Sequence, residues 1–311
     1  MKESKEFLKS LGYPVGDLYD LPTSDKRFAD GAQYRIELPS VEGPRALEAT
    51  LEEMDRNDLL VHRISQGSGI MLLSDHEITE MVAMCAGRGM ELSLFVGPRG
   101  TWDISALPFT ASGKAMGIRH EGADQLVYAM EDLKRGVQLG LRGALVGDEG
   151  LLLLTKEMKN HALLPKDFVV KCSVQMMASN PVSVKLIQDL GADTYNVPTA
   201  LTLPKLAAIR AAIDIPIDIY VEVPDNFGGF IRFYEIAEFI RILSPVYIKF
   251  GLRNHPDVYP SGKQWEATNI SLCRERVHRA LLGKQMIEKY YPEAITSGPA
   301  AAGLGVPVLK N

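Results

Sequence analysis

Residues 217–223 read IDIYVEV, and their apolar and polar side chains alternate without exception. Two other stretches, FVVKCSVQ (168–175) and VYIKFGLR (246–253), show nearly the same alternation. A β-strand turns successive side chains to opposite faces, so one face of each predicted strand is apolar and the other carries charge. The pattern therefore predicts strands with two chemically different faces.

Eight strand-like segments occur along the chain, and each is followed by an amphipathic segment long enough for a helix. We predict the strands at residues 34–38, 60–65, 91–96, 143–147, 168–174, 194–197, 217–223 and 246–250. Alternating strands and helices are typical of a parallel sheet whose apolar face is covered by helices. The polar face then points into a closed barrel, so we predict a (β/α)8 TIM barrel. A doubly wound open sheet is the alternative, although no GxGxxG motif follows the first strand.

The chain of 311 residues has room for one such barrel and two short extensions. A TIM barrel takes about 250 residues, and no linker interrupts the alternation of strands and helices. We therefore predict an N-terminal arm over residues 1–33, the barrel over residues 34–293 and a tail over residues 294–311. The tail is rich in Gly, Pro and Ala, and we expect it to be mobile or docked on a neighbouring subunit of a homo-oligomer.

Composition and charge narrow the classes of partner. A net charge of −5 and the lack of a basic stripe argue against a nucleic-acid partner. No apolar run is long enough to cross a bilayer and no signal peptide is recognisable, so we predict a cytoplasmic protein without a membrane partner. Cys85, Cys172 and Cys273 lie far apart and form no CxxC pair, which argues against zinc or a cluster bound by cysteines alone.

Charged and polar side chains concentrate near the predicted carboxyl ends of the strands, where TIM barrels carry their active sites. The candidates on the polar faces are Glu37, Arg63, Ser65, Ser93, Asp148, Lys171, Ser173, Asn196, Glu222, Lys249 and Arg253. A buried charge left without a partner costs about 3–5 kcal/mol, so this concentration indicates a function. A structural salt-bridge network is the alternative, and we expect it for Arg35, Glu91 and Asp218, which lie lower on their strands.

Two lysines are the candidate catalytic groups. Burial beside other cations lowers the pKa of a lysine, so Lys171 or Lys249 can act as a Schiff-base nucleophile or as a general base. Glu222 is then the expected proton relay. As an alternative, Glu37, Asp148 and Glu222 offer oxygen ligands to a divalent cofactor, Mg or Mn. Zinc is disfavoured because the chain lacks an HxH or HExxH pattern.

Two loops suggest an anionic substrate. Arg99 follows the third predicted strand and Arg253 the eighth, and a pair of arginines can bind a carboxylate or a phosphate. The amides of the glycine-rich loop at residues 66–69 are a weaker candidate for the same role. We expect Arg276, on the last predicted helix, to face solvent or another subunit.

Four stretches carry a family resemblance: YRIELPSVEGP (34–44), HRISQGSG (62–69), NVPTALTLPKLAAIR (196–210) and IKFGLRNHPDVYPSG (248–262). With these stretches the chain resembles the collagenase-like peptidases of unassigned catalytic type, over about residues 34–290. The resemblance implies a TIM barrel and a hydrolase. Better-known members carry a cysteine-rich segment, part of which binds an iron–sulfur cluster, and the chain lacks this segment. Neither the cluster nor any catalytic residue therefore transfers to this sequence.

Three functions follow from these observations. The first is an enzyme that acts on a small anionic metabolite as a lyase, aldolase or isomerase, with a lysine and a glutamate at its centre. The second is a peptidase-like or metal-assisted hydrolase, as the resemblance implies. The third is a barrel that binds a carboxylated ligand without turnover.

Overall fold

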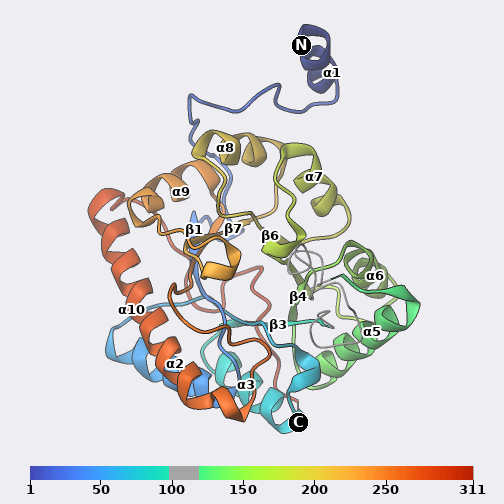
Figure 1. Ribbon diagram of the computed structural model, residues 1–311, viewed down its shortest axis with the longest axis vertical. Helices are drawn as coiled ribbons and strands as arrows, with labels where there is room; N and C mark the ends of the chain where they lie inside the picture. Colours follow the sequence, from blue (N-terminus) through green and yellow to red (C-terminus); the bar gives the residue numbers. More distant parts are fainter. Residues whose placement is uncertain (98–118, 311) are drawn as a thin grey trace.

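The computed structural model describes residues 1–97 and 119–310, and its strands form one closed parallel barrel in chain order, β1 to β8 (Figure 1). The strands are β1 (Tyr34–Leu38), β2 (Arg63–Gln66), β3 (Glu91–Phe95), β4 (Gly143–Val146), β5 (Val169–Cys172), β6 (Thr194–Asn196), β7 (Ile217–Glu222) and β8 (Val246–Phe250). Strands β1 and β8 pair in parallel, with Glu37 opposite Lys249. This closure confirms the predicted (β/α)8 fold and excludes the open sheet.

The helices surround the barrel in a ring (Figure 1). They are α2 (Pro44–Arg56), α3 (Asp75–Ala86), α5 (Gly122–Gln138), α6 (Glu149–Asn160), α7 (Pro181–Asp189), α8 (Leu203–Ala212), α9 (Ile236–Leu243) and α10 (Glu266–Tyr290). The apolar row of each strand packs against these helices, as Ile36, Ile219 and Ile248 show. Because that core takes the apolar faces, the polar faces are enclosed in the barrel, as the alternation predicted.

Strand β2 begins at Arg63, three residues later than predicted. The backbone N–H of Ile36 donates to Nδ1 of His62 at 3.0 Å, so this N–H has no part in the ladder between β1 and β2. Nε2 of the same ring lies 2.8 Å from the carbonyl oxygen of Ser297 in the tail. His62 therefore links β1 to the tail. Because Nδ1 accepts the N–H of Ile36, it carries no proton, and the imidazole ring is neutral.

The tail packs across the amino-terminal end of its own barrel, so the expectation of a mobile or neighbour-docked tail is wrong. The backbone N–H of Gly305 donates to Glu91 at 3.1 Å, and that of Val308 donates to the carbonyl of Gly140 at 2.9 Å. Arg35 donates to Ser297 at 2.8 Å from inside the barrel. The tail thus supplies partners for polar groups that would otherwise be buried alone at this end.

Acid is expected to weaken the attachment of the tail. Burial lowers the pKa of His62 to about 4, from 6.5 in an unfolded chain. Between these values the unfolded chain binds a proton that the folded chain lacks, so stability falls as the pH drops from 6.5 towards 4. At pH 4.5 this loss amounts to about 2–3 kcal/mol. Urea unfolding at pH 7 and pH 4.5 checks the prediction, because His62→Gln should show a smaller pH-dependent loss than the native chain; an equal loss in both contradicts it.

The N-terminal helix α1 (Lys2–Ser10) stands away from the barrel, at the top of Figure 1, and none of its residues is buried. The arm joins the barrel further along, where the N–H of Leu18 donates to the carbonyl of Pro204 at 3.1 Å. In the part of the chain that the structure describes, no helix combines the length and the apolar character needed to span a bilayer.

Candidate active site

Glu37 is the centre of the charged interior. Its carboxylate is in contact with the ammonium group of Lys171, and Lys249 approaches its other oxygen to 3.3 Å. Arg63 donates to it at 3.2 Å and the hydroxyl of Ser65 at 2.7 Å. Burial alone would raise the pKa of Glu37, but the three surrounding cations hold it well below its usual range. The carboxylate is therefore ionised at neutral pH.

A second group of charges lies next to the first, around Arg63. The guanidinium donates to Glu91 at 2.6 Å and to Asp218 at 3.2 Å, and it stacks 3.6 Å from the centre of the Tyr247 ring. These contacts confirm the salt-bridge network expected for Glu91 and Asp218. Arg63, which sequence analysis assigned to substrate binding, is fully enclosed by these partners.

The charges balance within the network around Glu37 and Arg63. The carboxylates are Glu37, Glu91 and Asp218, and the cations are Arg63, Lys171 and Lys249, each with at most 4% of its side chain exposed. Buried charges are tolerated when they are paired and hydrogen-bonded. The network therefore meets the physical requirement for placing two lysines inside the barrel.

The two lysines differ in access. Lys171 is fully buried between Glu37 and Asp218, whose oxygen lies 3.1 Å from its nitrogen. Burial lowers the pKa of Lys171 to about 8, against the opposing effect of the two carboxylates, and Lys249 contributes to the decrease. Lys249 instead lines a small cavity at the mouth of the barrel. Its nitrogen contacts Asn196 and lies 4.1 Å from the centre of the Tyr220 ring.

This mouth cavity lies at the carboxyl ends of the strands and is rich in hydroxyl and amide groups. Its walls are formed by Pro39, Ser40, Ser65, Gln66, Gly67, Leu145, Ser173, Val174, Gln175, Asn196, Tyr220, Phe227, Lys249 and Tyr259. The volume of about 30 Å³ has room for about two water molecules. Tyr259 narrows it, since its hydroxyl contacts that of Ser40 and its ring lies 2.5 Å from where a Cβ on Gly67 would be. At this volume the cavity has no room for a metabolite.

Three of the residues predicted to bind substrate, two serines and one asparagine, lie at the mouth of the barrel. Ser65, Ser173 and Asn196 all line the mouth cavity, so the structure brings them together with Lys249. Ser93 lies below, buried in the barrel, and its hydroxyl has no hydrogen-bond partner among the described residues. Arg99 lies outside the described residues.

Strict alternation predicts that Glu222 points into the barrel beside Lys171 and Lys249, but in the structure it does not lie beside them. The register between β7 and β8 shifts between Tyr220 and Glu222, which ends the inward row at Tyr220. The carboxylate of Glu222 pairs at 2.9 Å with Arg279 of α10 and accepts the N–H of Arg253 at 3.0 Å. A proton relay from Glu222 to either lysine is therefore not supported by the geometry.

Arg253 is a partly exposed loop residue, and its predicted partner in anion binding, Arg99, lies outside the described residues. Its guanidinium pairs with Asp225 at 2.7 Å. The glycine-rich loop also has an internal partner, because the amides of Gly67 and Ser68 donate to Glu42 at 2.7 Å and 3.0 Å. The anion bound by this loop is thus a carboxylate of the chain itself.

The predicted metal ligands do not form a metal site. Asp148 caps α6, where it accepts the N–H of Leu151 at 2.9 Å. Glu37 is surrounded by cations and Glu222 pairs with Arg279, so each carboxylate is already neutralised. Within residues 1–97 and 119–310 there is no group of three His, Cys, Asp or Glu side chains that could hold a metal ion. The expected Mg or Mn site at these residues is therefore wrong.

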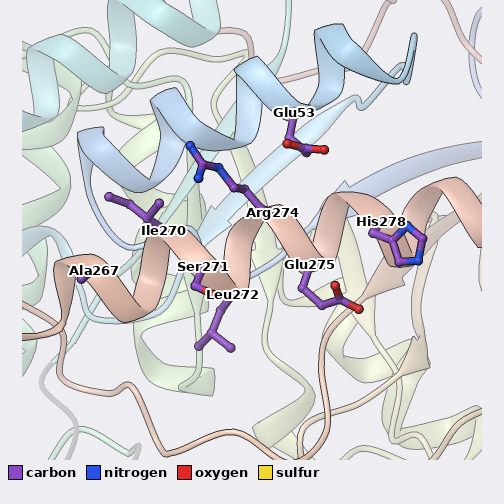
Figure 2. A pocket seen from close by; sticks show the side chains of 8 residues that line it. All are labelled: Glu53, Ala267, Ile270, Ser271, Leu272, Arg274, Glu275 and His278. Carbon is purple, nitrogen blue, oxygen red and sulfur yellow. The ribbon is translucent and has the colours of Figure 1, made fainter.

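A second hollow lies on the outer surface, and Figure 2 shows it between α10 and α2. It is lined by Glu53 of α2 and by Ala267, Ile270, Ser271, Leu272, Arg274, Glu275 and His278 of α10. The hollow is open to solvent and lies outside the ring of helices, away from the strand ends. The mouth cavity is therefore the better candidate for an active site.

Sequence analysis missed two residues near the mouth. Tyr220 shares the inward row of β7 with Asp218, so the alternation itself contained the signal. Arg276 was expected to be solvated, but its side chain is fully buried. It shares a helix face with the buried residues Cys273, Val277 and Ala280, and this spacing of three and four residues is the signal that identifies it.

Comparison with known proteins adds support for the fold alone. No protein-family model and no curated protein matches the chain. Among solved structures, a proposed fructose-1,6-biphosphate aldolase from Coccidioides immitis is similar, with a TM-score of 0.51 and 11% identity over 84% of this chain and 92% of that one. A proposed lyase/mutase from Burkholderia cenocepacia has a TM-score of 0.45 and 12% identity over 90% of both chains. The U32 peptidase Mk0906 has a TM-score of 0.43 and 15% identity over 77% of this chain and 98% of that one. Only the likeness to the proposed aldolase has a TM-score above 0.5, and at 11% identity it supports the fold and assigns no chemistry.

Proposed function

We propose that this protein is a lyase of the aldolase type, in which Lys249 forms an imine with the carbonyl group of a small anionic metabolite. One observation carries the proposal: Lys249 is the lysine of the charged network that also lines the mouth cavity. A lysine nucleophile must reach the substrate while its environment favours loss of the ammonium proton. Lys249 meets the first condition, because its side chain lines the cavity.

Imine formation assigns a role to each neighbour. The neutral amine of Lys249 adds to the carbonyl carbon and passes its excess proton to the carbonyl oxygen. A second proton converts the resulting hydroxyl group to water, which leaves as the iminium ion forms. Burial raises the pKa of Tyr220, so its phenol stays protonated beside the cavity and can donate this proton. The Tyr220 phenolate left by this step can take the proton of a hydroxyl group on the β carbon. The bond between the α and β carbons then breaks, its electron pair passes to the iminium, which becomes an enamine, and the fragment that carried the hydroxyl group leaves as a carbonyl compound.

In this mechanism Lys171 accepts the proton that Lys249 loses. It shares the carboxylate of Glu37 with Lys249, so a proton can pass from Lys249 to Lys171 along one carboxylate. With a pKa of about 8, Lys171 is partly neutral at mildly alkaline pH. Because it is enclosed by Glu37 and Asp218, Lys171 is a positioning and proton-transfer residue rather than the nucleophile.

Borohydride trapping tests the proposal. The native protein is incubated with pooled 2-oxo acids and sugar phosphates, reduced, and examined by intact mass and peptide mapping. We expect an adduct on Lys249 and none in Lys249→Met. An adduct mapped to Lys171, or none in the native protein while a member of the pool binds, would overturn the assignment. Binding without an adduct would favour a hydrolase or a binding barrel.

A further inference from the structure

Arg276 of α10 is a buried cation with unused hydrogen-bond donors. Its side chain is fully buried, and its Nη1 donates to the carbonyl of Ser40 at 3.1 Å and contacts Sγ of Cys273 at 3.6 Å. Nε and Nη2 are enclosed and have no hydrogen-bond partner in residues 1–97 and 119–310. No carboxylate in these ranges lies within ion-pair distance of the guanidinium. An arginine in this state is unusual, because buried guanidinium groups are almost always paired.

Arg210 of α8 shows what a structural buried arginine looks like in the same molecule. It too is buried and has no salt-bridge partner among the described residues. Its Nη1 donates to the carbonyl of Ile215 at 2.9 Å, and its Nη2 contacts the carbonyl of Ile213, so both terminal nitrogens bind carbonyls just after the helix. Burial therefore does not distinguish the two arginines. Among the described residues, Nε has no hydrogen-bond partner in either arginine, whereas Nη2 lacks one only in Arg276.

Arg276 lies directly behind the wall of the mouth cavity. Ser40, whose carbonyl it binds, is one of the wall residues and also contacts the hydroxyl of Tyr259. Tyr220, on another part of the wall, is close enough for the charge of Arg276 to oppose the rise in its pKa caused by burial. The contact with Ser40 thus places the guanidinium behind the wall of the cavity that Lys249 lines, although Arg276 does not itself line it.

We propose that Arg276 binds the anionic group of the ligand, a carboxylate or a phosphate, when Tyr259 moves out of the mouth. A guanidinium presents a planar fork that matches two oxygens of such a group, and Arg276 has both Nε and Nη2 available for it. The ligand's charge then neutralises the buried cation. The identity of the ligand as a substrate rests on the proposed function, but anion binding at Arg276 does not require turnover.

Anion binding is measured by thermal unfolding at constant ionic strength, with inorganic phosphate and with malonate as separate probes. For the native protein we expect a saturable rise in Tm with one of the two, which distinguishes a phosphate site from a carboxylate site. In Arg276→Met the Kd for that anion should increase by about 10- to 100-fold. Without anion, Arg276→Met should unfold at a higher Tm than the native chain, because it removes an unpaired buried charge.

Two variants separate the possible failures. Arg210→Met, which also removes a buried arginine without an ion-pair partner among the described residues, should leave the anion response unchanged. Lys249→Met should lose borohydride trapping, so failure of the imine proposal is visible independently of the anion response. An anion response in Arg276→Met equal to that of the native protein would overturn the inference, as would a native protein that responds to neither probe.

Discussion

Glu37→Gln lowers the free energy of unfolding by about 3–5 kcal/mol, the expected cost of removing one partner from a buried ion pair. The substitution keeps the volume of the side chain but removes the charge that Lys171, Lys249 and Arg63 share. Asp218 and Glu91 then remain as the anions near these cations. Urea unfolding at pH 7 with linear extrapolation measures the loss.

A double-mutant cycle identifies the cause of that loss. Because Glu37 and Lys171 are in contact, Glu37→Gln combined with Lys171→Met should cost at least about 1 kcal/mol less than the sum of the two single variants. The matched control is Glu48→Gln, which breaks an exposed pair with Arg45 and should change stability by less than about 0.5 kcal/mol. Strict additivity of the two interior substitutions is the result that contradicts a coupled network.

Imine formation at Lys249 should accelerate about 50-fold between pH 6 and pH 8, since the neutral fraction of a group with a pKa of about 8 grows by this factor. The group is Lys171, which must be neutral to accept the proton that Lys249 loses through Glu37. The rate of adduct formation, trapped with cyanoborohydride and a responsive 2-oxo acid or sugar phosphate, measures this dependence.

Lys171→Met provides the comparison, with far-UV circular dichroism as the check that it is folded. Its adduct should still map to Lys249, but the increase in rate centred on pH 8 should be lost. Two results would show that Lys171 does not accept the proton. One is a rate of adduct formation in the native protein that does not change between pH 6 and pH 8. The other is the same dependence of this rate on pH in Lys171→Met as in the native protein. Adduct formation in Lys171→Met that stops altogether points instead to Lys171 as the nucleophile.

The network also explains why Lys249 is held in one position. Its ammonium group has Glu37 and Asn196 as polar partners and the Tyr220 ring on one side. Asn196 is itself fixed by donating to the carbonyls of Val197 and Asp218 at 3.2 Å. A reactive group must be held by supporting contacts to act at a defined point in space. The balanced charges therefore provide orientation as well as stability.

Much of the fold and part of the site follow from local rules. Strict alternation in residues 217–223 and in the stretches around Lys171 and Lys249 placed polar side chains on one face, and helices between the strands forced that face inward. Glu37, Lys171 and Lys249 were therefore predictable as neighbours inside a barrel. Their pairing was not predicted, because Glu37 was expected to bind substrate or a metal ion; the structure shows it paired with both lysines.

The sequence by itself thus determined the closed (β/α)8 barrel and its charged interior, since both depend on periods of two and about 3.6 residues that are local properties of the chain. Only the tertiary structure decided which lysine reaches the mouth, that a register shift turns Glu222 towards Arg279, and that Arg276 is buried without a full set of partners. These outcomes depend on strand register, on loop packing and on contacts between residues far apart in sequence. Of these outcomes, only the burial of Arg276 leaves a local pattern, the helical spacing that it shares with Cys273 and Ala280.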